Sequence, residues 1–455
     1  MSKYQPYPEY KDSEIEWLGT IPSHWVRTNL KRYCQVTDGS HHSPKIESDG
    51  YPFVSVTDVG VNTINFSDAK RISPQNYERL VQEGCKPSVG DLLLTKDGTI
   101  GRACVVNDSM PDFVILSSLG LLTPTDKLLN NYLYYYLISG INVDQMNSMI
   151  HGSALKRMTI SKIDELILLL PSNEEQAQIA AFLDHETAKI DTLIEKQQQL
   201  IELLKEKRQA VISHAVTKGL NPDAPMKDSG VEWLGEVPEH WGVVQAKYIA
   251  DITRGAILRP VDDPRYFSDK GDWAYLNISD ATKCDKYLYD SKLKLSPLGS
   301  TKSARVYPDN VIITASATIG KAFINKIKVC VHDGFIPFCN SKLDINYLYH
   351  YLSNPYLYAA MGKSNTQKNI YLDEVKNMAV TFPPQEEQEA IVLYLESIAD
   401  KYVQLIKEAE TAITLIQERR TALISAAVTG KIDVRNWVTP TTSGDTNEAQ
   451  QEVIA

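Results

Sequence analysis

One fifteen-residue phrase occurs twice in this chain and constrains its architecture more than any other feature. The phrase reads KDSEIEWLGTIPSHW at residues 11–25 and KDSGVEWLGEVPEHW at residues 227–241. Three further pairs follow in the same order: NYLYYYL at 131–137 with NYLYHYL at 346–352, PSNEEQAQIAAFLD at 171–184 with PPQEEQEAIVLYLE at 383–396, and RQAVISHAVTKG at 208–219 with RTALISAAVTGK at 420–431. Because each second copy lies 212 to 216 residues after the first, the chain is predicted to contain two copies of one unit of about 210 residues.

Each copy ends in a segment with the apolar spacing of a long coiled-coil helix. Proline and an acidic EEQ triplet mark each start, and Lys218-Gly219 and Gly430-Lys431 mark the ends. About 45 residues of helix would form a rod of roughly 65 Å. So narrow an apolar stripe needs a partner in water, and the two helices are therefore predicted to pair antiparallel. The predicted seam consists of Leu183, Ile190, Leu193, Leu200, Leu204 and Val211 in the first helix, and Leu395, Ile398, Tyr402, Leu405, Ile416 and Leu423 in the second.

The region between phrase and helix has a mixed pattern in both copies. Alternating or β-branched runs at 51–59, 90–96 and 309–316 predict strands, whereas NYLYYYLIS predicts a helix with an apolar face. The predicted fold class is therefore α/β (α+β), with two pseudo-repeated globular domains separated by two long antiparallel coiled-coil helices. The predicted boundaries are 1–172 for the first domain with its phrase, 173–220 for the central helix, 221–384 for the second domain, 385–432 for the C-terminal helix and 433–455 for a disordered tail.

Motifs of catalysis and cofactor binding are missing from the sequence. It has no phosphate loop, no dinucleotide fingerprint, no G-x-S-x-G elbow and no [DNS]-P-P-[YFW] stretch of amino-group methyltransferases. The six cysteines lack metal-ligand spacing and are predicted to be reduced, mostly buried thiols. His41-His42 permits three interpretations: a metal ligand pair, a polar loop that presents donors to a ligand, or a solvated turn. No metal site is predicted. No apolar run could span a membrane, and a cytoplasmic protein is expected.

Charge does not exclude nucleic acid as a ligand, although the net charge is −10. The potential that a ligand meets is local. Residues 242–382 carry about +5 and residues 26–170 about −1, so most of the acidic excess lies elsewhere. A near-neutral first domain would by itself attract a polyanion only weakly.

Three pairs of loop segments at matched positions are candidates for ligand contact. They are LTKDGTIGRA (94–103) with ITASATIGKA (313–322), TDGSHHSPK (37–45) with TRGAILRP (253–260), and HGSALKR (151–157) with KSNTQKN (363–369). Small residues permit close approach to another surface, and a flanking cation suits a phosphate. A purely structural turn is the alternative. Segments that diverge at matched positions are predicted to meet different targets.

The sequence resembles the specificity subunit of a Type I restriction-modification system. The resemblance rests on the repeated KDS-x-x-EWLG-x-x-P-x-HW phrase, the TDGSHH and DGTIG turns, the EEQ-x-x-I helix starts and the R-x-x-x-I-S-x-AVT helix ends, and it covers about residues 10–431. It implies a non-catalytic, sequence-specific DNA-binding subunit with two target recognition domains. Each domain would read one half of a bipartite asymmetric site, and the helices would set the spacer and dock the modification subunits.

The resemblance also implies partners and contacts. The partners would be double-stranded DNA, two modification (methyltransferase) subunits and the restriction (translocase and nuclease) subunits, and no membrane. S-adenosylmethionine, ATP and Mg would bind to those subunits, so no cofactor is expected in this chain. The predicted DNA contacts are Ser40, His41, Lys45, Lys96, Thr99, Arg102, Lys156 and Arg157 in the first domain, and Arg254, Arg259, Ser316, Thr318, Lys321, Lys363, Gln367 and Lys368 in the second.

Two other functions compete with this interpretation. A duplicated coiled-coil scaffold that binds proteins or sugars accounts for the repeat but not for the divergent polar loops. A self-sufficient methyltransferase or nuclease conflicts with the missing motifs. The phrase tryptophans Trp17, Trp25, Trp233 and Trp241 are predicted to pack as anchors on the domains or near the helices, and intercalation into DNA is the alternative.

Overall fold

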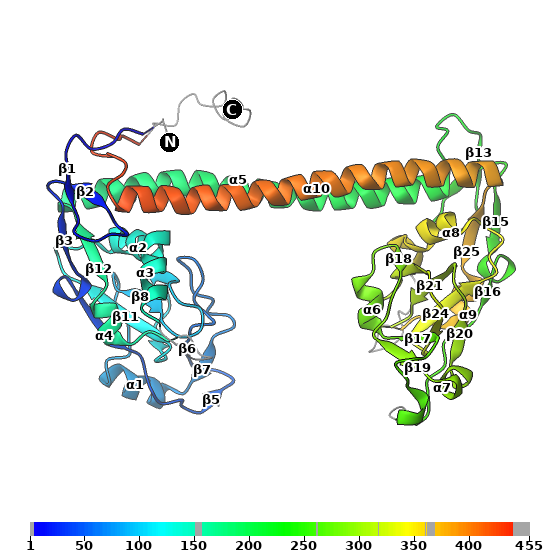
Figure 1. The fold of residues 1–455 in the computed structure, drawn as a ribbon, viewed down its shortest axis with the longest axis horizontal. Helices are drawn as coiled ribbons and strands as arrows, with labels where there is room; N and C mark the ends of the chain where they lie inside the picture. The colour runs from blue at the N-terminus through cyan, green and yellow to red at the C-terminus, as the bar shows by residue number, and fades with distance from the viewer. Residues whose placement is uncertain are drawn as a thin grey trace. The chain divides into compact units, whose positions relative to one another are not determined.

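The chain divides into two compact units. The computed structural model describes residues 4–150, 157–260, 263–316, 318–359, 361 and 369–439. Unit 1 comprises residues 1–197 and 411–455, and unit 2 comprises residues 198–410. Each unit contains one mixed domain and a segment of both long helices, α5 (Asn173–Lys218) and α10 (Gln385–Val428), as Figure 1 shows.

Unit 1 contains two four-stranded sheets and two strand pairs. The sheets have the orders β4-β11-β8-β9 and β10-β6-β7-β5, and every pairing in them is antiparallel except that of β10 with β6. Their strands are β4 (Cys34–Asp38), β5 (Ile46–Glu47), β6 (Tyr51–Val54), β7 (Lys70–Ile72), β8 (Leu92–Thr95), β9 (Ala103–Val105), β10 (Val114–Ile115) and β11 (Leu119–Pro124). The pairs are β1 (Tyr10–Asp12) with β2 (Thr20–Pro22) and β3 (Val26–Asn29) with β12 (Ile167–Leu170). The shorter helices are α1 (Pro74–Gln82), α2 (Asn130–Ile138), α3 (Gly140–Ser148) and α4 (Ile160–Asp164).

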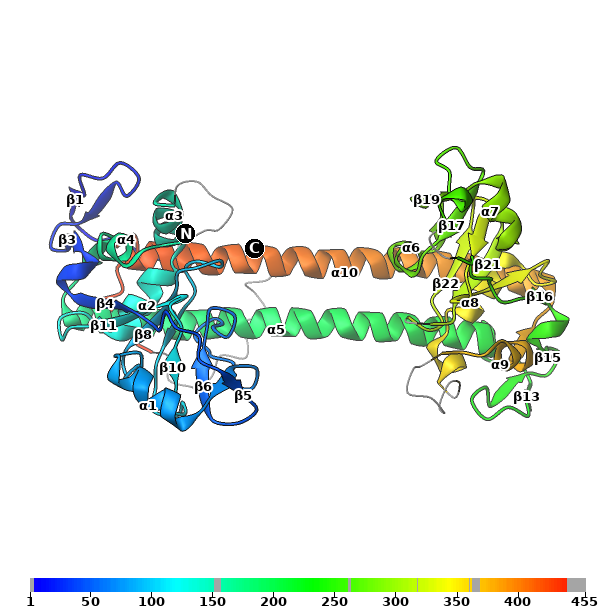
Figure 2. The same cartoon turned by 90° about the horizontal axis from the view of Figure 1, so that it is seen from below.

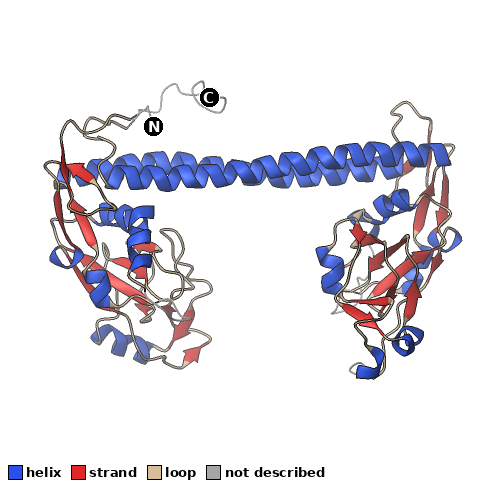
Figure 3. Cartoon of the chain, in the orientation of Figure 1, coloured by secondary structure: helices blue, strands red, loops and turns tan. Residues whose placement is uncertain are grey.

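Helix α2 forms the centre of the unit 1 core. It lies between the long helices and the β4-β11-β8-β9 sheet (Figures 1 and 3). Its tyrosines are buried, and three of them donate a hydrogen bond: Tyr132 to the Leu169 carbonyl at 2.8 Å, Tyr135 to Asp184 of α5 at 2.7 Å and Tyr136 to the Ile167 carbonyl at 2.9 Å. A buried hydroxyl without a partner would be costly, so these bonds explain why a tyrosine-rich helix is tolerated in the core.

Unit 2 repeats this plan with different details. A five-stranded sheet has the order β16-β24-β21-β22-β18 and a four-stranded sheet the order β19-β17-β23-β20. Their strands are β16 (Asp251–Ile252), β17 (Trp273–Leu276), β18 (Tyr287–Leu288), β19 (Leu293–Leu295), β20 (Ala304–Val306), β21 (Asn310–Thr314), β22 (Ala322–Asn325), β23 (Val329–Val331) and β24 (Phe335–Cys339). The strand pairs are β13 (Met226–Asp228) with β14 (Glu236–Pro238) and β15 (Gly242–Gln245) with β25 (Ala379–Phe382). The shorter helices are α6 (Ile278–Lys283), α7 (Pro297–Lys302), α8 (Ile345–Leu352) and α9 (Leu372–Asn377).

Helix α8 occupies the place of α2 in the unit 2 core. Tyr347 is fully buried and donates to the Val216 carbonyl of α5 at 3.1 Å. Tyr351 donates to the Ala379 carbonyl of β25 at 2.8 Å. The predicted fold class, with two repeated mixed domains and a coiled-coil pair of long helices, is therefore confirmed.

Within each unit the two long helices run antiparallel, side by side in Figures 1 and 2. In unit 1 the Arg420 guanidinium of α10 binds Asp191 of α5 at 2.9 and 3.2 Å. Both helices end where a glycine adopts a positive φ, +77° at Gly219 and +72° at Gly430, a conformation that glycine adopts without strain. The predicted stop signals are confirmed.

The predicted seam needs correction in part. Leu183, Ile190 and Leu395 are buried, and Leu204, Val211, Ile398, Tyr402, Ile416 and Leu423 are half-buried. The remaining three, Leu193, Leu200 and Leu405, are 44%, 44% and 46% exposed. A straight α-helix has 3.6 residues per turn, so positions seven residues apart rotate by about 20° around the helix axis with each repeat. A strict seven-residue spacing therefore assigns some positions to the seam that point away from the partner helix. Ile201, which the heptad omits, is buried beside the exposed Leu200.

The repeated phrase joins the two long helices in each unit. Trp25 is fully buried; its indole N–H donates to Glu175 at the start of α5 at 3.0 Å, and its ring packs beside Gly430 after α10. Trp241 repeats these contacts with Glu387 and Gly219. The anchor prediction is confirmed for these two residues.

The other two phrase tryptophans behave differently. Trp233 is half-buried and its ring centroid lies 6.3 Å from that of Tyr351. Trp17 is 47% exposed, so it is not an anchor in this structure. It lies in the connection between β1 and β2, where its ring has no core to enter.

The predicted tail begins too early. Val434 is buried, Trp437 packs edge-on against Phe182 at 5.6 Å, and the Asp433 amide donates to the Gln5 carbonyl at 2.8 Å. Residues 433–439 therefore belong to the folded part of unit 1, whereas residues 440–455 lie outside the described part of the chain. The predicted central helix, 173–220, agrees with α5 to within two residues, but α10 ends before the predicted 432.

All six cysteines are free, and four are buried. Burial raises the pKa of the Cys34 thiol to about 12 and that of Cys104 to about 11. A thiol with so high a pKa is a poor nucleophile at neutral pH. The prediction of mostly buried thiols is confirmed.

A histidine in the unit 2 core predicts loss of stability in acid. Burial, with the nearby cations Lys286 and Arg208, lowers the pKa of His350 to about 3, and its Nε2 has no hydrogen-bond partner among the described residues. Between pH 3 and 6.5 the unfolded chain binds a proton that the folded chain excludes, so this stabilisation is complete above pH 6.5 and declines as pH falls. From pH 6.5 to 5 the free energy of unfolding should fall by about 1.5 kcal/mol. Urea unfolding at several pH values should show a fall in stability that is smaller by this amount in His350→Phe than in the wild type, because burial also lowers the pKa of His332; equal falls would contradict the assignment.

Candidate nucleic-acid interface

Two hairpins at matched places in the repeat have the same backbone geometry. They are β8–β9 in unit 1 and β21–β22 in unit 2. The Thr95 amide donates to the Arg102 carbonyl at 2.9 Å, and the Thr314 amide to the Lys321 carbonyl at 3.1 Å. Each threonine hydroxyl also accepts the amide N–H of the same basic residue, at 2.9 and 3.1 Å. The paired T-I-G loops therefore form the same turn in both units, and this turn places a basic side chain, Arg102 or Lys321, at the same position.

A second pair of segments contains glycines that lie against other strands of each unit, β10 and β23. At Gly39 and Gly255, an added Cβ would collide with the carbonyl groups of Ile115 and His332. The residue after each glycine donates its amide N–H to the neighbouring strand, Ser40 to Ile115 at 2.8 Å and Ala256 to Val331 at 2.9 Å. Only glycine permits this backbone approach.

The residues that directly follow the third pair of segments, Met158 and Ile370, meet the same place. The Met158 amide donates to the Lys96 carbonyl at 2.8 Å, and the Ile370 amide to the Ala315 carbonyl at 3.0 Å. In each unit, described residues from three parts of the chain that are far apart in sequence therefore converge beside one hairpin. This convergence makes the place the candidate ligand-binding site of each unit.

In unit 1 the convergent loops carry a charge network. Lys96 is 1% exposed, and its Nζ lies 3.2 Å from Asp38 Oδ1 and 3.8 Å from Asp97 Oδ1. Asp97 in turn pairs with Arg157, whose Nε lies 3.3 Å away and whose side chain is 55% exposed. A buried ammonium requires such partners. Lys96 therefore holds the loops together in this structure, whereas a DNA contact would require an exposed side chain.

The other predicted residues of unit 1 divide by exposure. Ser40 is 3% exposed, and its hydroxyl bonds the backbone of His42; it shapes the turn and is not available to a base. His41 is exposed and lies 3.2 Å from Asp38 Oδ2. Three further side chains are exposed: Lys45, Thr99 and Arg102.

The predicted residues of unit 2 are also partly engaged. Arg254 is half-buried and its Nε donates to the Asp333 carbonyl at 2.8 Å. Lys321 Nζ donates to the Asp285 carbonyl at 3.3 Å, Ser316 is half-buried, and Thr318 and Arg259 are exposed. Four predicted contacts, Lys156, Lys363, Gln367 and Lys368, lie outside the described residues.

Matched backbone positions carry unlike side chains in the two units. The matching backbone hydrogen bonds show that Asp38 of unit 1 occupies the position of Arg254 in unit 2, and that Lys96 occupies the position of Ala315. The same site therefore presents an acid and a buried cation in unit 1, and a cation beside an apolar position in unit 2. The sequence prediction overlooked the carboxylates Asp38 and Asp97. Aligning the repeated loops residue by residue would have identified them as positions where the two copies differ in charge.

Among the described residues, no cluster of three or more His, Cys, Asp or Glu side chains could hold a metal ion. None of the helices in the described part of the chain is long and apolar enough to cross a membrane.

Comparison with known proteins shows what the chain is similar to. The family model of the type I restriction modification DNA specificity domain matches twice, at residues 23–203 and 238–415. The putative type I restriction enzyme MjaX specificity subunit of Methanocaldococcus jannaschii is 24% identical over 441 residues, which are 94% of this chain and 97% of the relative. The type I restriction enzyme EcoBI specificity subunit of Escherichia coli is 22% identical over 452 residues, 93% and 90% of the two chains.

A solved structure has the same fold. It belongs to a study of complex assembly and conformational transition of the type I R-M system, and its chain is 16% identical with a TM-score of 0.66. The match covers 90% of this chain and 99% of the other.

Proposed function

Because the chain belongs to the type I restriction modification DNA specificity family, we propose that it is the subunit that reads the DNA sequence for such a system. Each mixed domain reads one half of a bipartite, asymmetric site in double-stranded DNA. The observation that carries this proposal is the pair of convergent loop sites, which share backbone geometry but differ in side chains. Two readers built on one scaffold with unlike side chains suit two different half-sites.

Affinity and discrimination come from different side chains. Arginine and lysine that contact phosphate supply most of the affinity, whereas side chains that reach base edges supply the discrimination. Among the described residues, exposed or half-buried groups remain candidates for both roles: His41, Lys45, Thr99, Arg102 and Arg157 in unit 1, and Arg254, Arg259, Ser316, Thr318 and Lys321 in unit 2.

The subunit performs no catalysis in this proposal. The long helices set the unspecified spacer between half-sites and dock two modification subunits. These subunits bind S-adenosylmethionine and methylate adenine, which must leave the base stack to react, and restriction subunits bind ATP and Mg. The chain itself needs no cofactor, and the assembly works in the cytoplasm.

Salt dependence of DNA binding tests this proposal. Six to ten phosphate contacts would weaken binding by about 10³- to 10⁵-fold between 50 and 200 mM salt. The complex with modification subunits should show this loss on a specific duplex, and the isolated chain should bind far more weakly at every salt concentration. Binding by the complex that does not change with salt would contradict a DNA-reading role and favour a protein- or sugar-binding scaffold.

A further inference from the structure

The two phrase sites are equivalent except for the group that covers the glutamate at the start of each long helix. In unit 1, Glu175 is 5% exposed and accepts three hydrogen bonds. Its donors are Trp25 Nε1 at 3.0 Å, His24 Nε2 at 3.0 Å and the Tyr7 hydroxyl at 2.5 Å. Tyr7 comes from the N-terminal segment, which lies over this end of the helix pair.

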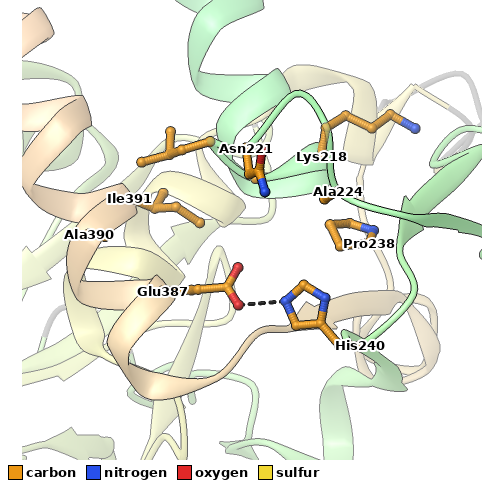
Figure 4. A pocket seen from close by; sticks show the side chains of 10 residues that line it. Lys218, Asn221, Ala224, Pro238, His240, Glu387, Ala390 and Ile391 are labelled. Atoms are coloured by element: carbon orange, nitrogen blue, oxygen red, sulfur yellow. Dashed lines mark hydrogen bonds and ion pairs between the residues drawn. The ribbon is translucent and has the colours of Figure 1, made fainter.

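In unit 2 the third donor is missing among the described residues. Glu387 receives Trp241 Nε1 at 3.0 Å and His240 Nε2 at 2.5 Å, and its side chain is 40% exposed. It faces a cavity of about 220 Å³ that is lined by Leu220, Ala390 and Ile391 among others (Figure 4). A carboxylate can accept about four hydrogen bonds, so Glu387 has capacity for a further donor from the cavity.

The aromatic side chains beside the two glutamates are likewise covered in unit 1 and exposed in unit 2. Phe182 is 1% exposed because Tyr4 and Trp437 lie edge-on against it, at 5.3 and 5.6 Å between ring centroids. Its counterpart in α10, Tyr394, is 41% exposed. Tyr394 follows Ala390 by one helical turn and so lies on the same face as the cavity lining.

The residues that follow the two long helices also differ in exposure between the units. Ile432 after α10 is 7% exposed, whereas Leu220 after α5 is 40% exposed. Leu393, next to Tyr394, is 69% exposed. Unit 2 therefore presents an uncovered apolar surface around an acceptor, where unit 1 covers the equivalent surface with aromatic side chains.

This chain offers no tyrosine outside its described residues to cover the surface. Every Phe, Trp and Tyr lies in the described residues, and the segments outside them, 1–3, 151–156, 261–262, 317, 360, 362–368 and 440–455, contain none. The exposed tyrosines of a second copy, such as Tyr248 at 61% and Tyr356 at 58%, lie in short helices of its folded domain and not in an extended segment like that of Tyr7. These observations favour an extended segment of a different polypeptide as the occupant.

We propose that the cavity beside Glu387 receives a tyrosine from an extended segment of a modification subunit. The hydroxyl donates to Glu387, as Tyr7 does to Glu175, and the apolar part of the segment covers Leu220 and Tyr394. The inference rests on the proposed function, which supplies the partner, and it specifies where that partner is held. It also distinguishes the two phrase sites, because the equivalent site in unit 1 is filled by this chain's own N-terminal segment.

A tryptophan that blocks the cavity tests the proposal. Ala390 is exposed and lines the cavity, and its neighbour Glu389 is exposed and does not. Ala390→Trp in the full chain should weaken binding of the purified modification subunit by about tenfold or more, whereas Glu389→Trp should bind as the wild type does. Unchanged binding by Ala390→Trp would overturn the inference alone. A wild-type chain that binds no modification subunit would overturn the proposed function, and the inference with it.

Photo-crosslinking identifies the occupant. A benzophenone amino acid at position 390 of the full complex should crosslink to a tyrosine-containing segment of the modification subunit. A crosslink to this chain, a crosslink to a segment without an aromatic residue, or no crosslink would each overturn the inference.

Discussion

Replacement of Trp25 by alanine is expected to destabilise unit 1 by about 3–5 kcal/mol, the range observed when a large buried aromatic residue is removed. The side chain is fully buried, and three parts of the unit meet on it: Tyr7 at 5.8 Å between ring centroids, Glu175 through the indole N–H, and Gly430 after α10. The substitution opens a cavity and also removes a donor from a buried carboxylate, which adds to the cost.

Trp17 offers a matched control within the same phrase. It is 47% exposed, so Trp17→Ala should change the free energy of unfolding by no more than about 0.5 kcal/mol. Urea unfolding, followed by far-UV circular dichroism, measures both variants. Equal stability of the two variants would show that the phrase does not anchor the helix ends.

Exchange of residues 242–382 for the equivalent segment of a relative is expected to replace one half of the recognised DNA sequence completely. The other half and the gap should remain. The ends of this segment are neighbours in the fold, because Gly242 of β15 pairs with Phe382 of β25. A donor segment would therefore bring its own closing strand pair and leave α5 and α10 untouched.

The reciprocal exchange provides the control. Val26 of β3 pairs with Leu170 of β12, so exchange of residues 26–170 should replace only the other half. Methylation patterns of cells that express each chimaera with its modification subunits report the outcome. A change in both halves from one exchange, or a change in the gap, would contradict independent readers.

The repeat explains why the architecture was predictable from the sequence. Segments that recur at a fixed offset specify the same local structure twice, and each copy supports the interpretation of the other. The helix starts, the glycine stops at Gly219 and Gly430, the tyrosine-rich helices and the T-I-G hairpins all form as predicted. A two-stranded coiled coil also has a strong periodic signal.

Single side chains were less predictable because their surroundings come from distant parts of the chain. Lys96 lies beside a glycine turn, where a lysine is usually solvated, and only the fold brings Asp38 to its ammonium group. Trp437 follows a helix stop in a polar sequence, yet it packs on Phe182. Neither contact leaves a local pattern in the sequence, so neither could be predicted from it.

The most direct test of the central claim is a genome-wide methylation map of cells that carry this chain and its partner subunits. Two unlike readers in one chain predict adenine methylation in a single motif made of two defined parts with a fixed gap of unspecified bases. Methylation within one uninterrupted sequence, or at sites without a common motif, would contradict the account.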